Sequence, residues 1–260
     1  MLNIKDAVAV ITGGASGIGL ALAHYWVGQG GRLVLGDIAE EPLESARRQI
    51  AGEVATVVCD VTNENDCARL ADTAIERFGG IHLVAPFAGI IKDGMMLNIN
   101  SDRQVAGKMA LKDFQKVIDI NLTGVFLTVR ECAERMIQHR CSGLICLISS
   151  TGSMGTAGQI NYSSTKAAMA VMPKVITAEF FRRNVADKIR CLAVAPGYVG
   201  TQMVKNMPQK VLDKIVEQVP IGRLIQPEEV AAFVGELYRN EALAGEVYFI
   251  HGGLRLGSRG

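Results

Sequence analysis

Apolar residues occur along the chain in short runs that alternate with amphipathic segments. The runs are rich in Val, Ile and Leu and predict seven β-strands, at residues 7–12, 32–37, 54–60, 81–89, 143–150, 189–196 and 246–253. Apolar positions at helical spacing between them predict helices at roughly 17–29, 41–51, 64–78, 111–139, 161–183, 208–217 and 227–240. Strands that are apolar on both faces are typical of a parallel sheet covered by helices on both sides. We therefore predict a doubly wound α/β fold with a seven-stranded parallel sheet, in one domain over residues 1–260.

The composition narrows the function classes. Hydrophobic residues make up 49% of the 260 residues, and the net charge of +1 comes from interspersed acidic and basic residues. This balance gives no indication of a nucleic-acid groove or of a charged membrane-binding patch. The apolar run at 7–12 is too short for a signal peptide, and no stretch approaches the ~18 apolar residues of a membrane span, so we expect a cytoplasmic protein.

Cysteine spacing argues against a metal site. The chain contains no CxxC pair and no His/Cys cluster with zinc spacing. Most of the cysteines fall in apolar strand or helix patterns, which favours reduced thiols in the core. The six residues are Cys59, Cys67, Cys132, Cys141, Cys146 and Cys191.

A glycine-rich turn follows the first predicted strand. The stretch T-G-G-A-S-G-I-G (12–19) places Gly13, Gly17 and Gly19 directly before a helix, with Ser16 and Ile18 between the last glycines. Glycines permit a tight bend, and the helix N-terminus offers free N–H groups to a pyrophosphate. A glycine turn alone can be only a turn, but its place between strand and helix favours a dinucleotide site.

Asp37 strengthens this interpretation. It ends the second predicted strand, about 20 residues beyond the glycine turn, where a carboxylate can accept hydrogen bonds from a ribose diol. The alternative is an exposed strand-end residue or a helix cap. A 2′-phosphate would meet Asp37 as a like charge, because Ile38 follows it and no Arg or Lys lies in the turn; Arg47 and Arg48 are a helix away. The pattern favours NAD(H) over NADP(H).

Asp60 ends the third predicted strand. Its side chain is placed to bond an adenine amino group, with the backbone of Val61 beside it. The alternative is that Asp60 caps the next helix.

The stretch ISSTGSMGTAGQINYSSTK (148–166) carries the candidate chemistry. Tyr162 and Lys166 lie on one face of a predicted helix, four residues apart. A free tyrosine has a pKa near ~10, and a neighbouring ammonium or a nicotinamide's positive charge would lower it. Ser149 lies at a strand end, where its hydroxyl can hold a substrate oxygen beside the tyrosine. An amphipathic helix face is the alternative for the Tyr/Lys pair alone.

With these motifs together, the chain resembles a short-chain dehydrogenase/reductase over essentially its full length. The matching stretches are TGGASGIG (12–19), Asp37, Asp60, AG (88–89), Asn121 in NLTG, Ser149, YSSTK (162–166) and PGYVGT (196–201). The resemblance implies a Rossmann fold. It implies Tyr162 as general acid/base, Ser149 as the residue that orients the carbonyl, and Lys166 as the residue that lowers the tyrosine pKa and binds the nicotinamide ribose.

The same resemblance implies further roles. Asn121 would hold a water that links Lys166 to a proton relay. Ser149 is preferred to Ser150 because a serine-to-tyrosine spacing of thirteen is usual in the family. The remaining implied cofactor contacts are Ala88 and Gly89, and Pro196, Val199 and Thr201 near the carboxamide. Helices 111–139 and 161–183 would form the subunit contact of a homotetramer.

Two departures from the family pattern stand out. The family usually has N-N-A-G after the fourth strand, where this chain has Pro86-Phe87-Ala88-Gly89, so side-chain hydrogen bonds are lost there. The segment 97–109 adds about ten residues to the usual connection, and NIN and RQVAG around Ser101-Asp102 predict a small hairpin. It is either a tolerated surface loop or an added wall or partner contact near the substrate mouth.

Within the family, the chain is most similar to the 3-oxoacyl-ACP reductase group. NYSSTKAA, VAPGYVGTQM, PIGRLIQPEEVA (220–231) and IHGGLRL carry this likeness, and 201–219 resembles a substrate lid. It implies an acyl-thioester substrate on acyl carrier protein or CoA. A dehydrogenase acting on a 3-hydroxyacyl-CoA or another secondary alcohol, and a non-catalytic nucleotide sensor or scaffold, remain alternatives.

Overall fold

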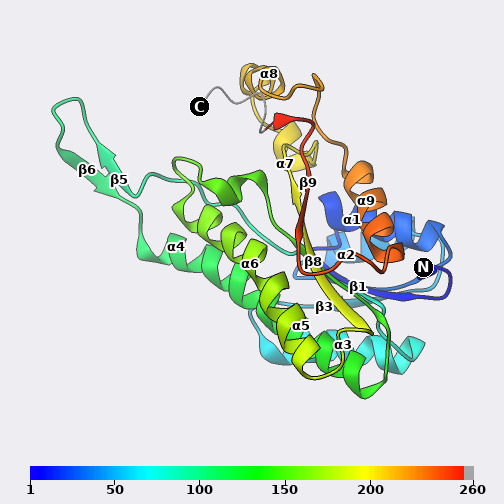
Figure 1. Cartoon of the computed structure of the whole chain (residues 1–260). Helices are drawn as coiled ribbons and strands as arrows, with labels where there is room; N and C mark the ends of the chain where they lie inside the picture. The colour runs from blue at the N-terminus through cyan, green and yellow to red at the C-terminus, as the bar shows by residue number, and fades with distance from the viewer. Residues whose placement is uncertain (255–260) are drawn as a thin grey trace.

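The computed structural model describes residues 1–254, so the last two residues of IHGGLRL lie outside it. Seven parallel strands form one sheet in the order β3-β2-β1-β4-β7-β8-β9 (Figure 1). The strands are β1 (Val8–Thr12), β2 (Arg32–Asp37), β3 (Val54–Val58), β4 (Leu83–Pro86), β7 (Gly143–Ile148), β8 (Ile189–Pro196) and β9 (Val247–Ile250). The predicted doubly wound fold is confirmed.

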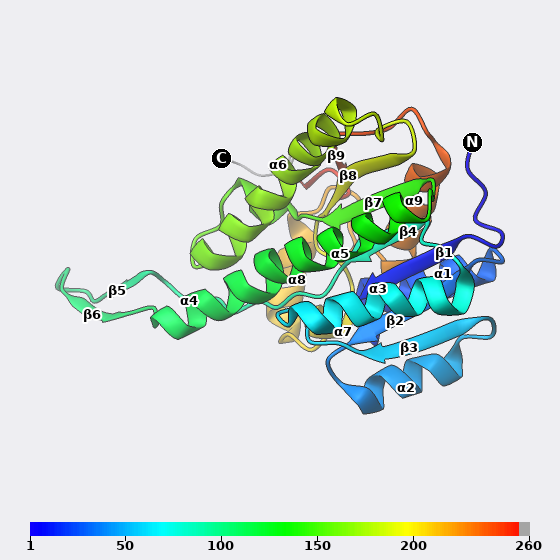
Figure 2. The same ribbon diagram turned by 90° about the horizontal axis from the view of Figure 1, so that it is seen from below.

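Helices cover both faces of the sheet and bury an apolar layer on each (Figures 1 and 2). One layer holds α1 (Gly17–Gly28), α2 (Glu40–Gln49) and α9 (Pro227–Arg239); the other holds α3 (Glu64–Phe78), α5 (Gly124–Gln138) and α6 (Ile160–Arg182). In the first layer the indole of Trp26 donates to Ala7 O at 3.0 Å and packs edge-on against Tyr238, with ring centroids 4.8 Å apart. The sheet is therefore buried from both sides, as its strand composition predicts.

Helix boundaries follow local signals in the sequence. The N-cap residue of α3, Asn63, accepts a hydrogen bond from the Asn65 N–H, and Gly79 ends the helix in a left-handed conformation with φ of 80°. Helix α9 begins with Pro227 at its first turn, behind a reciprocal capping pair of Gln226 and Glu229.

The predicted helix at 111–139 differs from the observed structure. Helix α4 (Leu111–Ile118) passes into a π-helical turn (Asp119–Thr123) and then into α5. Asn121 lies in this turn and is fully buried; its amide accepts from Ile90 N–H at 2.8 Å and donates to Ile90 O at 2.9 Å. The wide turn thus carries a side chain that is bonded to the loop after β4, and π-turns are frequent at such functional positions.

The insertion at 97–109 forms the predicted hairpin. Strands β5 (Leu97–Ile99) and β6 (Val105–Lys108) pair antiparallel, with a bulge between Asn98 and Ile99. Figures 1 and 2 show the hairpin extending away from the rest of the molecule at the N-terminal end of α4.

The segment after β8 contains two helices instead of one. The predicted helix at 208–217 corresponds to α8 (Gln209–Glu217), and a short α7 (Gln202–Lys205) precedes it. Pro208 separates them, because a proline disfavours a helical conformation in the residue before it.

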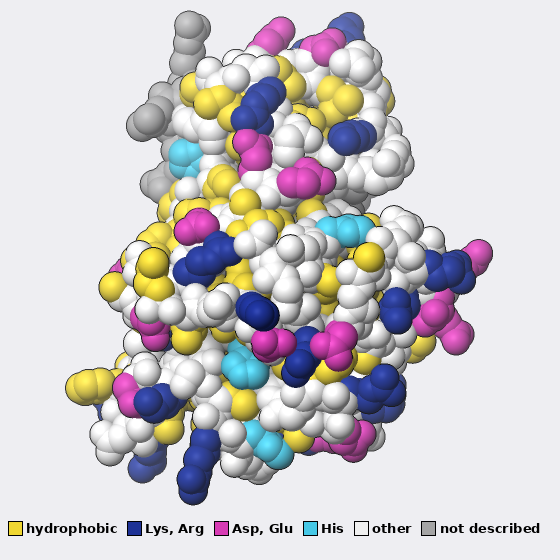
Figure 3. Space-filling model, turned by 90° about the vertical axis from the view of Figure 1, so that its right-hand side faces the viewer, with side chains coloured by type: hydrophobic (Ala, Val, Ile, Leu, Met, Phe, Trp, Pro, Cys, Tyr) yellow, Lys and Arg dark blue, Asp and Glu magenta, His cyan; other side chains and the backbone are white. Residues whose placement is uncertain are grey.

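The surface shows no strong charge field on the side drawn in Figure 3, where basic and acidic side chains alternate. Within residues 1–254, no helix is both long and apolar enough to cross a membrane. All six cysteines are buried and unpaired.

Candidate active site

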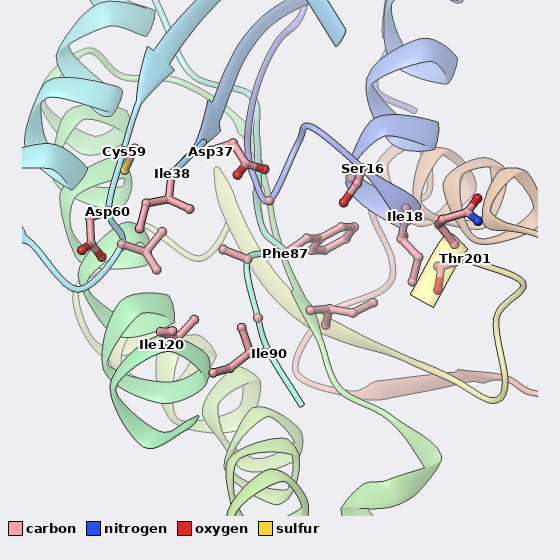
Figure 4. A pocket seen from close by; sticks show the side chains of 18 residues that line it. Ser16, Ile18, Asp37, Ile38, Cys59, Asp60, Phe87, Ile90, Ile120 and Thr201 are labelled. Carbon is pink, nitrogen blue, oxygen red and sulfur yellow. The ribbon is translucent and has the colours of Figure 1, made fainter. Parts of the chain in front are cut away.

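A pocket of about 390 Å³ opens at the carboxyl ends of the strands, where β1 lies between β2 and β4 (Figure 4). The strand order reverses at this point, and open α/β sheets bind ligands at such switch points. Its lining includes twelve of the predicted cofactor residues: Gly13, Ser16, Gly17, Ile18, Gly19, Asp37, Ile38, Asp60, Val61, Ala88, Gly89 and Thr201.

The glycine turn is shaped by close backbone approach. Gly13 and Gly17 have φ of 66° and 55°, a region that side chains disfavour. A Cβ on Gly13 would lie 2.8 Å from the Ala88 backbone, and one on Gly19 would lie 2.2 Å from Gly13 O. The N-terminus of α1 therefore faces the pocket without a side chain in the way, and Ser16 makes no capping hydrogen bond there. Such a helix end fits a pyrophosphate.

Asp37 is held at the rim of this turn. Its carboxylate accepts from Ala15 N–H at 3.0 Å and from Ala39 N–H at 3.4 Å. The first bond connects the end of β2 to the glycine turn and fixes the carboxylate at the pocket wall. Figure 4 shows Asp37 beside Ile38 on the same side of the pocket.

Asp60 also lines the pocket, but it does not cap a helix. Its Oδ1 accepts from the backbone and the hydroxyl of Thr62, at 2.9 and 2.7 Å, while Asn63 is the cap residue of α3. The capping alternative raised by the sequence is therefore wrong, and the Asp60 carboxylate forms a local turn at the pocket edge.

Four of the predicted cofactor residues lie outside this lining: Tyr162, Lys166, Pro196 and Val199. Val199 is buried, and its segment pairs with Ile225 through the bond from Gly200 N–H to Ile225 O at 2.8 Å. Thr201 does approach the glycine turn, since its methyl group would be 3.3 Å from a Cβ on Gly17. The segment after β8 thus reaches the pocket through Thr201.

Phe87 occupies the position where a polar residue was expected. It lines the pocket and packs against the apolar layer beneath the glycine turn, and Figure 4 shows its ring between the Asp37 and Ser16 sides. The neighbouring Ala88 N–H donates to the Thr12 hydroxyl at 3.3 Å. This contact joins β1 to the loop after β4 without the asparagine.

The two adjacent serines point to different places, and this differs from the expectation. Ser149 is only 2% exposed, and its hydroxyl donates to Lys166 O at 2.8 Å. The Ser150 hydroxyl accepts from Gly152 N–H at 3.0 Å and lies close enough to Tyr162 to oppose the rise in the pKa of its phenol. Successive side chains of an extended segment alternate between faces, so only one serine can face the tyrosine. Ser150 therefore becomes a candidate for that position beside Ser149.

Tyr162 and Lys166 lie one turn apart on α6. The Lys166 ammonium is 5.5 Å from the centre of the Tyr162 ring and donates to Ile148 O at 2.8 Å. Burial lowers the pKa of Lys166 to about 8. Burial also raises the pKa of Tyr162, an effect that the bond with Ser150 opposes and the charge of Asp93 reinforces. The expected lowering of the tyrosine pKa is thus not present in the chain alone, because desolvation and the charge of Asp93 outweigh the hydrogen bonding with Ser150.

Asn121 is fully engaged by its side chain. Both ends of its amide bond the backbone of Ile90, so the side chain is oriented toward the loop after β4. Its main chain lies in the π-helical turn, where the carbonyl pattern of a regular helix is altered.

The sequence did not indicate the hydrogen bonds that connect the loop after β4 to the start of α6. Asn161 is fully buried, donates to Lys92 O at 3.0 Å and accepts from Tyr162 N–H at 2.7 Å. Gln159 donates to the Asp93 carboxylate at 2.9 Å. These bonds join the loop after β4 to the start of α6, just before Tyr162. Asn161 adjoins the tyrosine in the sequence, but nothing in the sequence indicates its partner, which lies 69 residues earlier.

The arrangement suits proton transfer beside a bound nucleotide. A phenol, a serine hydroxyl and a lysine are gathered at the end of β7, next to a pocket with a free helix N-terminus. Among residues 1–254, no group of His, Cys, Asp or Glu side chains could hold a metal ion.

Comparison with known proteins identifies the family. A family model described as short chain dehydrogenase matches residues 7–212. A 3-oxoacyl-[acyl-carrier-protein] reductase of Thermotoga maritima is 31% identical over 97% of this chain and 99% of its own length. A 3-hydroxyacyl-CoA dehydrogenase type-2 of Bos taurus is 34% identical over 98% and 97%.

Among solved structures, a short-chain dehydrogenase/reductase of Brucella melitensis, titled glucose/ribitol dehydrogenase, superposes with a TM-score of 0.85. It is 27% identical and covers 96% of this chain and 97% of its own. The resemblance found in the sequence, including that to the 3-oxoacyl-ACP reductases, is confirmed. The chain belongs to the short-chain dehydrogenase family of oxidoreductases.

Proposed function

We propose that the protein is an NAD(H)-dependent oxidoreductase that interconverts a ketone and a secondary alcohol. One observation carries this proposal: the Tyr162 phenol, the Ser150 hydroxyl and the buried Lys166 meet beside a pocket that begins at the glycine turn. A phenol with a hydroxyl neighbour can pass a proton to a carbonyl oxygen, and the pocket can hold a dinucleotide alongside it.

Each residue of the candidate site has its own role in the proposed reaction. The nicotinamide, when bound, supplies or accepts the hydride. Ser150 donates a hydrogen bond to the substrate oxygen, and Tyr162 protonates that oxygen during reduction or deprotonates the alcohol during oxidation. Lys166 holds the nicotinamide ribose and, once the cofactor's positive charge adds to its own, helps offset the desolvation that raises the tyrosine pKa. Ser149 is assigned to the support of Lys166 instead of to the substrate.

The cofactor residues keep the roles that the sequence predicted. The free N–H groups of α1 and the turn from Gly13 to Gly19 receive the pyrophosphate, and Asp37 receives the ribose diol. Asp60 and Val61 flank the adenine, while Thr201 with Pro196 and Val199 forms the wall near the carboxamide. Among residues 1–254, no Lys or Arg lines the pocket, so charge supports the preference for NAD(H) over NADP(H).

The substrate we favour is a 3-oxoacyl thioester on CoA or acyl carrier protein. The support is the likeness to the reductase of Thermotoga maritima over nearly the full length of both chains. The second candidate is oxidation of a 3-hydroxyacyl-CoA, supported by the likeness to the bovine dehydrogenase. Both reactions would use the same catalytic side chains, the first in the direction of reduction and the second in the direction of oxidation.

We further infer a homotetramer in the cytoplasm. Helices α5 and α6 each carry exposed apolar side chains, among them Phe126 on α5 and Val171 and Val175 on α6. Exposed apolar patches of this kind mark subunit contacts.

The decisive experiment is a substrate panel run in both directions with NAD(H) and NADP(H). Oxidation of NADH by acetoacetyl-CoA and by an acetoacetyl carrier protein is compared with reduction of NAD by 3-hydroxybutyryl-CoA. Turnover that requires Tyr162 supports the proposal. Cofactor binding without turnover of any ketone or secondary alcohol would favour the sensor or scaffold alternative.

A further inference from the structure

Three hydrogen bonds fasten the loop after β4 to the start of α6, and we call this set of bonds the seam. Each of the residues 92–94 takes part in one bond. The bonds run from Asn161 Nδ2 to Lys92 O at 3.0 Å, from Gln159 Nε2 to the Asp93 carboxylate at 2.9 Å, and from Gly94 N–H to Gly158 O at 2.8 Å. The seam thus ends one residue before Tyr162.

The inner end of the seam is rigid. Asn161 is fully buried, and its side-chain oxygen accepts from Tyr162 N–H at 2.7 Å. The amide that bonds Lys92 O therefore also bonds the backbone of the tyrosine. A buried amide that turned away would leave polar groups unpaired, which is costly. The position of the loop relative to Tyr162 is therefore fixed.

The outer end of the seam carries a charge. Asp93 is exposed, and its carboxylate is bonded to the neutral amide of Gln159. It forms no ion pair with any residue in the range 1–254, because the adjacent Lys92 pairs instead with Asp113 on α4, at 3.7 Å. The seam therefore holds a full negative charge at the start of α6.

Charges of both signs lie around the Tyr162 phenol. On the same helix, the Lys166 ammonium is 5.5 Å from the centre of the tyrosine ring. The π-helical turn contributes Asp119, which accepts a hydrogen bond from a glutamine of α4. The 3₁₀ helix Thr151–Met154 and the carboxyl ends of β7 and β8 contribute only uncharged side chains. The remaining charge is that of Asp93, across the seam.

The charge of Asp93 is felt at the tyrosine. Burial is the main cause that raises the pKa of Tyr162, the charge of Asp93 raises it further, and hydrogen bonding with Ser150 lowers it. The sign follows from electrostatics, since a negative charge nearby disfavours a phenolate. Because the seam fixes the loop, this effect is a built feature of the site.

We propose that Asp93 is a positioning residue of the reaction: held by Gln159, its negative charge favours the protonated form of the Tyr162 phenol. This inference rests on the proposed role of Tyr162 as general acid and base. Lys166 and the positive charge of a bound cofactor act in the opposite sense. The protonation of the phenol is then set by opposed charges on two separate elements of the fold.

Titration of the tyrosine tests this coupling without turnover. The chain contains five tyrosines, and with ¹³Cζ labelling the resonance that is absent in Tyr162→Phe is that of Tyr162. Asp93→Asn keeps the shape of the side chain and removes its charge, so it should lower the pH at which this resonance titrates. The matched control is Asp187→Asn, an exposed acid paired with Lys188 before β8, which should leave the titration unchanged.

Ionic strength separates an effect of charge from an effect of shape. Because Asp93 is exposed, the difference between Asp93→Asn and wild type should be largest in dilute buffer. It should nearly vanish at about 1 M salt, where the screening length is about 3 Å. Gln159→Met removes the amide that holds the carboxylate and should give a smaller shift in the same direction. In the Asp93→Asn background, Gln159→Met should add nothing.

The pH profile of turnover gives a second measurement. The kcat/KM for oxidation of an alcohol rises as the tyrosine loses its proton, so Asp93→Asn should move this rise to lower pH. At a fixed pH below the rise, kcat/KM should increase by about twofold, the scale of an exposed charge interaction. NADH affinity, measured by fluorescence titration, should stay unchanged.

Two results would overturn the proposal: a Tyr162 resonance that titrates at the same pH in Asp93→Asn as in wild type, or a shift that is as large at high salt as in dilute buffer. Either result in a protein that turns over ketones would refute the role of Asp93 alone. A shifted resonance in a protein that turns over no ketone or alcohol would support the coupling and count against the proposed activity.

Discussion

The nucleotide end and the substrate end of the site are built in different ways. At the nucleotide end, backbone atoms form the surface: Gly13, Gly17 and Gly19 allow chain segments to approach within van der Waals contact, and α1 presents its free N–H groups. At the substrate end, side chains form the surface, and Asn161 and Gln159 bond it to a loop some 66 to 69 residues earlier. The first surface is determined by local sequence, whereas the second depends on tertiary contacts.

This difference indicates which amino-acid substitutions each end of the site will tolerate. A backbone surface is lost only when its shape changes, so most substitutions there act through steric conflict. A side-chain surface can lose one function while the fold remains. Substitutions at the two ends should therefore separate cofactor binding from chemistry.

The largest effect is expected at the substrate end. Tyr162→Phe removes the hydroxyl that carries the proton, and kcat should fall by about 10²- to 10⁴-fold, the usual contribution of a general acid. NADH affinity, measured by fluorescence titration, should change little, because the phenyl ring remains. Tyr248→Phe, on β9, is the control. Near wild-type turnover by the Tyr162→Phe variant would show that another group transfers the proton.

The cofactor preference tests the nucleotide end. Wild-type kcat/KM should be about 10²-fold higher with NADH than with NADPH, because Asp37 repels a 2′-phosphate and the described part of the pocket lining holds no cation to offset it. Asp37→Ser should reduce this ratio, mainly by weakening NADH, and adding Ile38→Arg should then favour NADPH. The measurement is kcat/KM for both cofactors with one ketone. Equal values for the wild type would contradict the assignment of Asp37.

The buried lysine makes a prediction about stability. The pKa of Lys166 is lowered from 10.5 to about 8, so the folded state carries a burial penalty below pH 8 that is relieved as pH rises from 8 to 10.5. Lys166→Met removes the penalty. The gain in unfolding free energy of this variant over wild type should therefore shrink with rising pH across that window, by on the order of 3 kcal/mol.

Urea unfolding of both proteins at pH 7, 9 and 10 measures this gain. Comparing the two proteins at each pH cancels the titration of other groups. A gain that stays constant from pH 7 to 10 would mean that the lysine is not desolvated.

The smallest effects should separate the two serines. Ser150→Ala should lower kcat/KM by about tenfold or more, because a hydrogen bond to the substrate oxygen is lost. Ser149→Ala should cost about 1 kcal/mol of stability through the bond to Lys166 O, with a smaller effect on turnover. Thermal unfolding and steady-state kinetics on both variants give the comparison. The reverse ranking in kcat/KM would restore Ser149 to the substrate.

The sequence predicted the nucleotide end well because its signals are local. The glycine spacing and the strand-end position of Asp37 each have a direct structural meaning, and the structure gathers these residues around one pocket. The alternation of apolar strands with amphipathic helices likewise predicted the sheet and its layers.

The choice between Ser149 and Ser150 could not be made from the sequence. Counting residues back from Tyr162 favours Ser149, but the segment between them contains a 3₁₀ helix, Thr151–Met154, whose length sets the register. The direction of a side chain is fixed by the strand it follows, and β7 directs Ser149 toward the backbone of α6. The hydrogen-bond partners of Asn161 and Gln159 cannot be inferred from the sequence either, because they lie on a loop whose position depends on the whole fold.

The π-helical turn at Asp119–Thr123 has a consequence for the evolution and redesign of this chain. A π-turn contains one residue more than the α-helical turn it replaces, so deleting one residue there would restore a regular helix. Each residue of a helix turns about 100°, and the deletion would rotate α4 and the hairpin by that angle relative to α5. The Asn121 side chain would at the same time lose its two hydrogen bonds to the backbone of Ile90. A single-codon deletion would therefore redirect the hairpin and open the loop after β4 at the same time. The direction of the hairpin and the position of this loop can thus change only together when the turn is shortened.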